Sequence, residues 1–334
     1  MKGKKLFPLL LRIVVSIALI GYFLLILTQK QGGLATAFHK LLSAFADASL
    51  QWLLPALLLH LVGYSLISLR WKILLKAQAV EARFAQLFLF YFMAAFFNLV
   101  LPSTIGGDAV RAVESRTLTG STAKSAMVVI IERLTGLLAL ILIAAAALAL
   151  RLSERSGRVQ FIWLFLGLGI LGFFLLTVLA HPRLGPKILK GLLKLLPIRL
   201  RPTVERAYEA VAVYYRRPGI LLLSLAISLL FQFNMVVYYY LIALALGQQP
   251  LFLDFMLFIP VMIFLLMVVP AINGLGVRTA GFKELMRFPA AYALAAEMLD
   301  LGMRIGYGLL GGLLFLIYRR PKDHSHNSQP DSGS

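Results

Sequence analysis

Residues 126–150 read AMVVIIERLTGLLALILIAAAALAL, a run of 25 in which only Glu132 and Arg133 are charged. A helix needs about 20 predominantly apolar residues to cross the hydrocarbon of a bilayer, so this run is long enough to span it. Seven further apolar runs approach or exceed that length: Leu6–Leu27, Trp52–Leu69, Phe84–Leu101, Phe161–Leu179, Ile220–Leu246, Leu251–Val269 and Ala290–Tyr318.

The composition places the chain in lipid rather than in water. Hydrophobic residues make up 60% of it and charged residues 14%, whereas about a quarter of the residues of a soluble globular domain are charged. So much apolar surface cannot be buried inside a protein of 334 residues, which excludes a soluble enzyme. The chain has no cysteine, so disulfides, thiolate metal sites and thiol nucleophiles are excluded as well.

The formal net charge of +19 comes from basic residues that lie between the apolar runs. This placement is typical of topology signals and of contact with anionic headgroups, so we expect no binding of nucleic acid. If all eight runs crossed with the N-terminus inside, 14 Lys and Arg residues would lie inside and 17 outside. If Phe84–Leu101 and Leu251–Val269 instead dip in and return to the side they entered from, the counts become 23 and 8. The second arrangement obeys the positive-inside rule.

The predicted fold is therefore all-α, a polytopic transmembrane helical bundle with six full crossings and two re-entrant segments. We expect both termini to be cytoplasmic and the membrane to be a bacterial-type inner membrane. Eight full crossings remain the alternative, because Phe84–Leu101 and Leu251–Val269 are both long enough to span.

A single transmembrane domain is predicted for residues 1–321. Within it, repeat halves at about residues 50–150 and 218–318 would be joined by a basic interfacial helix at residues 181–217. The polar tail at residues 322–334 has no periodicity and is predicted to be disordered.

The two suspected re-entrant runs end in the same kind of break. Residues 101–111 read LPSTIGGDAVR and residues 269–278 read VPAINGLGVR, each with a proline, then two glycines, then an arginine. Proline stops a helix by removing a hydrogen-bond donor, and glycine permits a tight reversal of the backbone. The residues of the predicted breaks are Pro102, Gly106, Gly107, Pro270, Gly274 and Gly276.

The matching breaks indicate an inverted repeat. Three full crossings separate them in the re-entrant arrangement, so the second copy would be inverted relative to the first. Inverted repeats with helices broken near the midplane of the membrane are typical of transporters. The alternative is that the proline and glycine residues only form ordinary loops at the ends of helices.

At these positions the chain resembles the lysylphosphatidylglycerol synthase transmembrane-region family. The resemblance covers roughly residues 10–318 and is carried by Arg70-Trp71, Asn98, Pro102, Gly106, Arg111, Glu132-Arg133 and the stretch Pro270–Arg278. It implies a role in moving lipids or lipid-linked precursors between leaflets. In the best-known members the module precedes a soluble aminoacyl-transferase domain that makes lysyl-lipids, and we expect this chain to lack that domain.

Several charged residues lie inside the apolar runs, where an ionised side chain costs about 2.5–3.5 kcal/mol. Glu132 and Arg133 are neighbours on a helix and point about 100° apart, so each is expected to pair with another helix. Glu297, Asp300 and Arg304 share one helical face, and the last two can pair directly. Buried ion pairs that only fix the helix register are the alternative to a functional role.

The candidate site is a ring of these side chains around a central cavity. Arginine can hold a lipid phosphate through two parallel hydrogen bonds. The residues expected to bind the headgroup are Arg111, Arg133, Arg278, Arg304, Asn98 and Asn273. The carboxylates expected to balance their charge or to carry a coupled proton are Asp108, Glu132, Glu297 and Asp300. No metal site and no cofactor is predicted.

The favoured function is a flippase-like lipid translocase, not an enzyme, that moves an anionic or polyprenyl-linked lipid between leaflets. Two alternatives stay open: a scaffold that recruits a separate lipid-modifying synthase, and a membrane enzyme that acts on lipid phosphates. Such an enzyme would need paired aspartates for magnesium or a histidine near an arginine cluster, and the sequence has neither. The nucleotide-binding pattern GxxxxGK[ST] is absent, so transport is expected to be passive, ion-coupled or driven by a partner.

Overall fold

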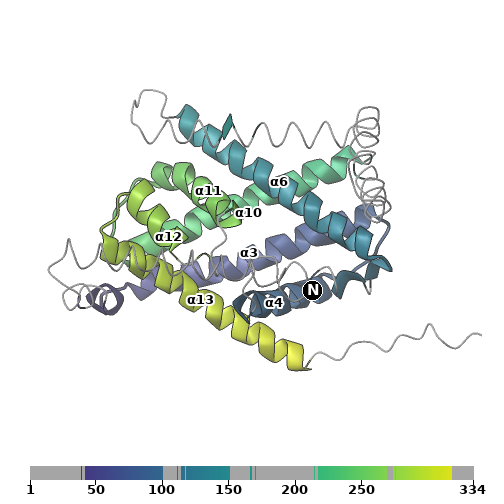
Figure 1. Ribbon diagram of the computed structural model, residues 1–334, viewed down its shortest axis with the longest axis horizontal. Helices are drawn as coiled ribbons and strands as arrows, with labels where there is room; N and C mark the ends of the chain where they lie inside the picture. The colour runs from purple at the N-terminus through teal and green to yellow at the C-terminus, as the bar shows by residue number, and fades with distance from the viewer. Residues whose placement is uncertain are drawn as a thin grey trace, which may run out of the picture.

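The structure is a computed structural model, and all the regular secondary structure that it describes is helical (Figure 1). It describes residues 42–100, 118–150, 217–268 and 276–317, and also residues 39, 111, 114–116, 166, 167, 170, 214 and 274. The run Leu6–Leu27, almost all of the predicted interfacial helix and the tail at residues 322–334 lie outside the described residues. The prediction of an all-α helical bundle is confirmed.

The main helices of the described part form two sets of three. The first set is α3 (Leu50–Ala77), α4 (Phe84–Val100) and α6 (Thr122–Ala149). The second set is α10 (Pro218–Ala245), α11 (Phe252–Val268) and α13 (Ala290–Ile317). Each set contains helices of 28, 17 and 28 residues in that order. Corresponding helices start at residues 50 and 218, 84 and 252, and 122 and 290, so one constant offset relates the first set to the second.

Four of these helices are long and apolar enough to cross a membrane: α3, residues 127–149 of α6, α10 and α13. The helices α4 and α11 are also apolar, but their 17 residues fall short of the length of a typical span. Exposed side chains along the long helices are mostly large and apolar, as a lipid-facing surface requires; examples are Leu58, Leu222 and Leu313. The chain is a multi-pass membrane protein.

The boundaries follow local chemistry where the sequence supplies a signal. Pro218 occupies the first turn of α10, where its missing N–H costs nothing. The Ser121 side chain accepts from the Lys124 N–H at the start of α6. Helix α3 continues from the predicted end at Leu69 to Ala77, because Trp71, Leu74 and Leu75 on this last part are fully buried and hold it in the bundle.

The helices pack in pairs that each join one helix of the first set to one helix of the second. Helix α3 packs on α10, α4 packs on α13, and α6 packs on α11 (Figure 1). The Ser49 N–H donates to the Ala245 carbonyl over 2.9 Å at one end of the α3–α10 pair, and Arg217 Nη1 donates to the Lys76 carbonyl over 3.4 Å at the other. These two contacts show that α3 and α10 run antiparallel.

Residues close to the start of each short helix lie beside residues close to the start of the long helix that follows it. Gln78, just after α3, donates through Nε2 to the Lys124 carbonyl over 3.3 Å, so α6 begins where α3 ends. In the second set, the ring of Phe255 near the start of α11 lies 6.3 Å from that of Phe288, just before α13. Residues 78 and 124 are therefore neighbours at one end, and residues 255 and 288 are neighbours at one end.

Close approach between α4 and α13 depends on glycine. A Cβ added to Gly311 would lie 1.9 Å from the Phe92 carbonyl oxygen, and one added to Gly308 would lie 2.2 Å from Leu99 Cδ1. Small residues of this kind let two membrane helices approach backbone to backbone. This contact holds the end of α4 beside α13, which carries the second group of charged residues.

Candidate functional site

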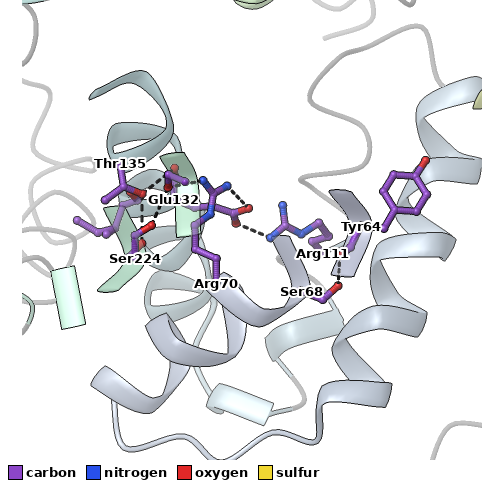
Figure 2. A network of polar contacts seen from close by, with 9 residues as sticks. Tyr64, Ser68, Arg70, Arg111, Glu132, Thr135 and Ser224 are labelled. Atoms are coloured by element: carbon purple, nitrogen blue, oxygen red, sulfur yellow. Dashed lines mark hydrogen bonds and ion pairs between the residues drawn. The ribbon is translucent and has the colours of Figure 1, made fainter. Parts of the chain in front are cut away.

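Glu132 on α6 is buried between two arginines, and we call this group the Glu132 cluster (Figure 2). Its Oε1 accepts from Arg70 Nη2 over 2.7 Å, and its Oε2 accepts from Arg111 Nη2 over 2.5 Å. Arg70 also donates through Nη1 to the Ser228 hydroxyl on α10 over 2.8 Å. The cluster therefore joins α3, α6 and α10 to Arg111, the residue that ends the first predicted break. A buried carboxylate needs such charged donors to stay ionised.

Aromatic rings fix the direction of Arg111. Its guanidinium carbon lies 4.4 Å from the centroid of Trp71 and 5.0 Å from that of Tyr91. Cations at such distances from a ring face are attracted by its quadrupole. Arg111 is thus held by Glu132 on one side and by two rings on others.

Asp300 on α13 is the centre of a second group, the Asp300 cluster. Its Oδ2 lies 2.8 Å from Arg304 Nε and 3.0 Å from Arg278 Nε, and its Oδ1 accepts from the Tyr238 hydroxyl over 2.9 Å. The predicted pairing of Asp300 with Arg304 is confirmed.

The two clusters occupy corresponding positions in the chain. The constant offset between the two helix sets relates Glu132 to Asp300. It also relates Arg70 to Tyr238, each of which bonds to the carboxylate of its own cluster. Arg278 lies one position before the place that corresponds to Arg111.

Arg278 is positioned by a tight backbone turn. Gly274 and Gly276 have φ angles of +70° and +80°, which disfavour any residue with a Cβ. A Cβ on Gly274 would also lie 2.3 Å from Leu266 Cδ2. The turn leads into the one-turn helix α12 (Val277–Ala280), which continues as the π-helix η2 (Gly281–Leu285). Both glycines therefore have a left-handed backbone conformation at the predicted break.

Glu297 holds this turn in place. Its Oε1 accepts from the Gly276 N–H over 2.8 Å, and its Oε2 accepts from the Thr279 N–H over 3.1 Å and from the Thr279 hydroxyl. The carboxylate thus satisfies backbone N–H groups around the start of α12. Since Arg278 lies between these two residues, Glu297 fixes the backbone from which Arg278 extends.

A cavity of about 270 Å³ lies between the two clusters. Of the predicted headgroup-binding residues, the structure brings four to its wall: Arg111, Arg278, Arg304 and Asn98. Gly274 also lines it. The three carboxylates Glu132, Glu297 and Asp300 are at most 4% exposed and are not among the described lining residues.

The structure corrects one predicted member of the ring. Arg133 is exposed on α6 and does not line the cavity, because Glu132, its neighbour one position back on the helix, takes the inward direction. The neighbours do diverge as predicted, but only one can face the bundle. Asn273, Asp108, Pro102, Gly106, Gly107 and Pro270 lie outside the described residues.

Arg70 is a buried member of the Glu132 cluster that the sequence did not reveal as part of the candidate site. It ends an apolar run, where a basic residue reads as a topology signal, yet its side chain is only 7% exposed. The signal that identifies it is its correspondence, at the offset between the helix sets, to Tyr238, which bonds to Asp300.

One wall of the cavity is aromatic and connects the two clusters. Successive ring centroids are 5.1 Å apart from Tyr91 to Tyr64, 4.9 Å from Tyr64 to His60, and 5.3 Å from His60 to Tyr238. Tyr91 faces Arg111, and Tyr238 bonds to Asp300. The Glu132 and Asp300 clusters therefore lie at opposite ends of this row of rings. Among the described residues, no group of three or more acidic or histidine side chains could hold a metal ion.

Comparison with known proteins agrees with this architecture. Residues 9–311 match the family described as the lysylphosphatidylglycerol synthase TM region. No curated protein and no solved structure matches the chain. A match to this family indicates a membrane protein involved in lipid metabolism or transport. Because the match covers most of its length, the chain belongs to the lysylphosphatidylglycerol synthase transmembrane-region family.

Proposed function

We propose that the chain is a lipid translocase that moves an anionic or polyprenyl-linked lipid between leaflets and catalyses no reaction. The observation that carries this proposal is the cavity lined by Arg111, Arg278 and Arg304 inside a bundle of membrane helices. Arginine in the apolar part of a membrane is costly and is typical of ion and substrate pathways. A phosphate headgroup is the ligand that such a cluster binds best.

The pattern of the helices supports an inverted repeat. The helix lengths of 28, 17 and 28 residues and the constant offset between the sets fit two copies of one unit. The antiparallel α3 and α10 occupy corresponding places in these copies, as inversion requires. The offset also relates residue 50 to 218 and residue 150 to 318, the limits predicted for the repeat halves. Transporters of this design bind substrate where the two copies meet.

The ends of the short helices support re-entrant segments. The contact of Gln78 with the Lys124 carbonyl fits a first segment that returns to the side it left, and the Phe255–Phe288 contact fits the same for the second. Exposed basic side chains gather where α3 ends and where α6 and α10 begin: Lys72, Lys76, Arg83, Lys124 and Arg217. The positive-inside rule makes this end cytoplasmic in a bacterial-type inner membrane. Together with the charge pattern of the sequence, this supports a cytoplasmic position for both termini.

The buried carboxylates supply counter-charge when no lipid is bound. Glu132 pairs with Arg111, and Asp300 pairs with Arg278 and Arg304, so each of these three arginines of the cavity has an anion beside it in the empty protein. A headgroup phosphate shares these arginines with the carboxylates. Because the arginines are already paired, lipid binding does not require the desolvation of unpaired arginines. When the lipid leaves, each arginine still has a carboxylate partner within the membrane. The partners in this account are anionic membrane lipids, alone or delivered by a separate synthase.

The test is protein-dependent exchange of a labelled anionic lipid between the leaflets of proteoliposomes. We expect exchange by the unmodified chain, and a loss of at least tenfold in Arg278→Ala and Arg304→Ala. Arg83→Ala is the matched control, because Arg83 is exposed in the loop before α4 and is not among the residues that line the cavity. A folded chain that exchanges neither anionic nor polyprenyl-linked lipid would favour the scaffold function instead.

A further inference from the structure

The cavity has two separate sets of arginine, one from each helix set. Arg111 comes from the first, and Arg278 and Arg304 come from the second. Every acidic or basic residue among the described lining residues, His60 apart, is an arginine, and Glu132 and Asp300 lie behind them. A ligand in the cavity therefore meets cationic groups from two directions.

The rings of the aromatic wall run from one set to the other. Arg111 lies against Tyr91 at one end, with its guanidinium carbon 5.0 Å from the ring centroid. At the other end, Tyr238 donates to Asp300 Oδ1 over 2.9 Å, and Asp300 binds Arg278 and Arg304. The rings of Tyr64 and His60 lie between these ends, at successive centroid distances of 5.1, 4.9 and 5.3 Å. Each set thus lies at its own end of the row of rings, and we call these two places the subsites of the cavity.

A headgroup with two anionic groups matches the two subsites better than one phosphodiester does. A phosphodiester has one negative charge, whereas a two-group anion gives each set of arginines an anion of its own to accept its hydrogen bonds. A volume of about 270 Å³ is many times the ~30 Å³ that one water molecule takes up in the liquid, which leaves room for two anionic groups.

We infer that the transported headgroup carries two anionic groups, as in a lipid diphosphate or a bisphosphate. One group binds Arg111, and the other binds Arg278 and Arg304. The corresponding chain positions of Glu132 and Asp300 explain why the site has two such ends: each repeat contributes one carboxylate with an arginine in front of it. This inference rests on the proposed function and names the class of lipid that the cavity selects.

Soluble anions test the inference without any transport step. Binding of inorganic phosphate, inorganic diphosphate and 1,3-bisphosphoglycerol to the full chain in detergent is measured by titration calorimetry. We expect at least one of the two-group anions to bind ten times more tightly than phosphate. Arg111→Lys and Arg304→Gln should each bring that anion to within about threefold of phosphate, since each variant disables one subsite.

Two controls separate this result from general attraction to a basic protein. Arg83→Gln should leave all three affinities unchanged, and thermal unfolding should show that each variant is folded. Arg111→Lys is chosen because it retains a positive charge beside Glu132. Equal affinities for all three anions, no binding of any of them, or an unchanged two-group affinity in Arg111→Lys would each overturn the inference.

The inference and the proposed function can fail separately. Exchange of a phosphodiester lipid together with equal anion affinities would leave a translocase with a single subsite. Tight, subsite-dependent binding of a two-group anion without any exchange of lipid would leave the binding site and remove the translocase.

Discussion

The side chain of Arg70 packs against the backbone of Gly136, where an added Cβ would be 3.5 Å from Arg70 Nη1. The offset between the two helix sets relates Gly136 to Arg304, just as it relates Arg70 to Tyr238. The second arginine of the Glu132 cluster thus comes from α3, whereas in the Asp300 cluster it comes from α13 itself, one turn after the carboxylate. A Cβ at this position would only contact Arg70, whereas a longer side chain would occupy the place of its guanidinium.

This relationship predicts that one cluster can be rebuilt in the pattern of the other. Arg70→Tyr removes one of two charged donors to a buried carboxylate, which should lower the free energy of unfolding by about 3–5 kcal/mol. Gly136→Arg alone should also destabilise, because its side chain would collide with Arg70. The double variant should recover most of the loss, since its two new side chains would then repeat the roles of Tyr238 and Arg304.

Thermal or denaturant unfolding in detergent measures the stability of the unmodified chain, of the two single variants and of the double variant. A double variant no more stable than Arg70→Tyr would show that the two clusters are not interchangeable.

The contact between α4 and α13 predicts unequal effects of the same substitution along one helix. Gly311→Ala places a Cβ 1.9 Å from the Phe92 carbonyl oxygen, so the helices must separate, at a cost of about 1–3 kcal/mol or more. Gly302→Ala is the matched control, because nothing lies within 4 Å of its added Cβ. It should be neutral or stabilise by up to about 1 kcal/mol through helix propensity. Unfolding curves that shift equally for the two variants would contradict the packing of α4 on α13.

The ends of the short helices predict a specific pattern of labelling. The chain has no cysteine, so single cysteines can be introduced without a background. Glu81→Cys and Lys124→Cys should react with a membrane-impermeant maleimide from the same side of oriented vesicles, because residues 78 and 124 are neighbours. Gln249→Cys and Glu284→Cys should react together from the opposite side. Labelling of residues 81 and 124 from opposite sides would mean that α4 crosses the membrane.

Substitution of Glu297 should lower the stability of the protein, whereas the same substitution of the exposed Glu284 should not. Glu297→Gln replaces an oxygen that accepts from backbone N–H groups with an amide that donates, which should cost about 1.5–3 kcal/mol of stability. The displaced turn should also lower lipid exchange as far as Arg278→Ala does. Glu284→Gln is the control, since the Glu284 side chain is 55% exposed and its pairing with Lys283 contributes about 0–1 kcal/mol. Normal exchange by Glu297→Gln would show that Arg278 needs no such support.

The helices could be predicted closely because the signal is local. Predicted and observed limits of α4, α6, α11 and α13 agree to within about one turn, since a long apolar run must be helical to satisfy its backbone in lipid. The end of α3 was missed because Arg70 and Lys72 interrupt the apolar pattern. The helix continues past these two residues because Trp71 and Leu74 are buried, and their burial depends on the packing of several helices.

The site was only partly predictable, for a related reason. Matching breaks identified Arg111 and Arg278, and helical spacing identified Asp300 with Arg304. The sequence could show that Glu132 and Arg133 point in different directions but not which one faces inward, because the orientation of α6 is set by α10 and α11. Arg70 was missed as a site residue because its partners Glu132 and Ser228 lie 62 and 158 residues away.

Passage of lipid headgroups through the cavity is tested most directly by the rate at which a labelled anionic lipid moves between leaflets in proteoliposomes. We predict rapid exchange by the unmodified chain, unchanged exchange by Arg133→Ala and Arg83→Ala, and at least a tenfold loss in Arg304→Ala. The contrast is direct because Arg133 is exposed on α6, whereas Arg304 lines the cavity. Exchange that persists in folded Arg304→Ala and Arg278→Ala proteins, or that fails in Arg133→Ala alone, would contradict the claim that lipid headgroups pass through this cavity.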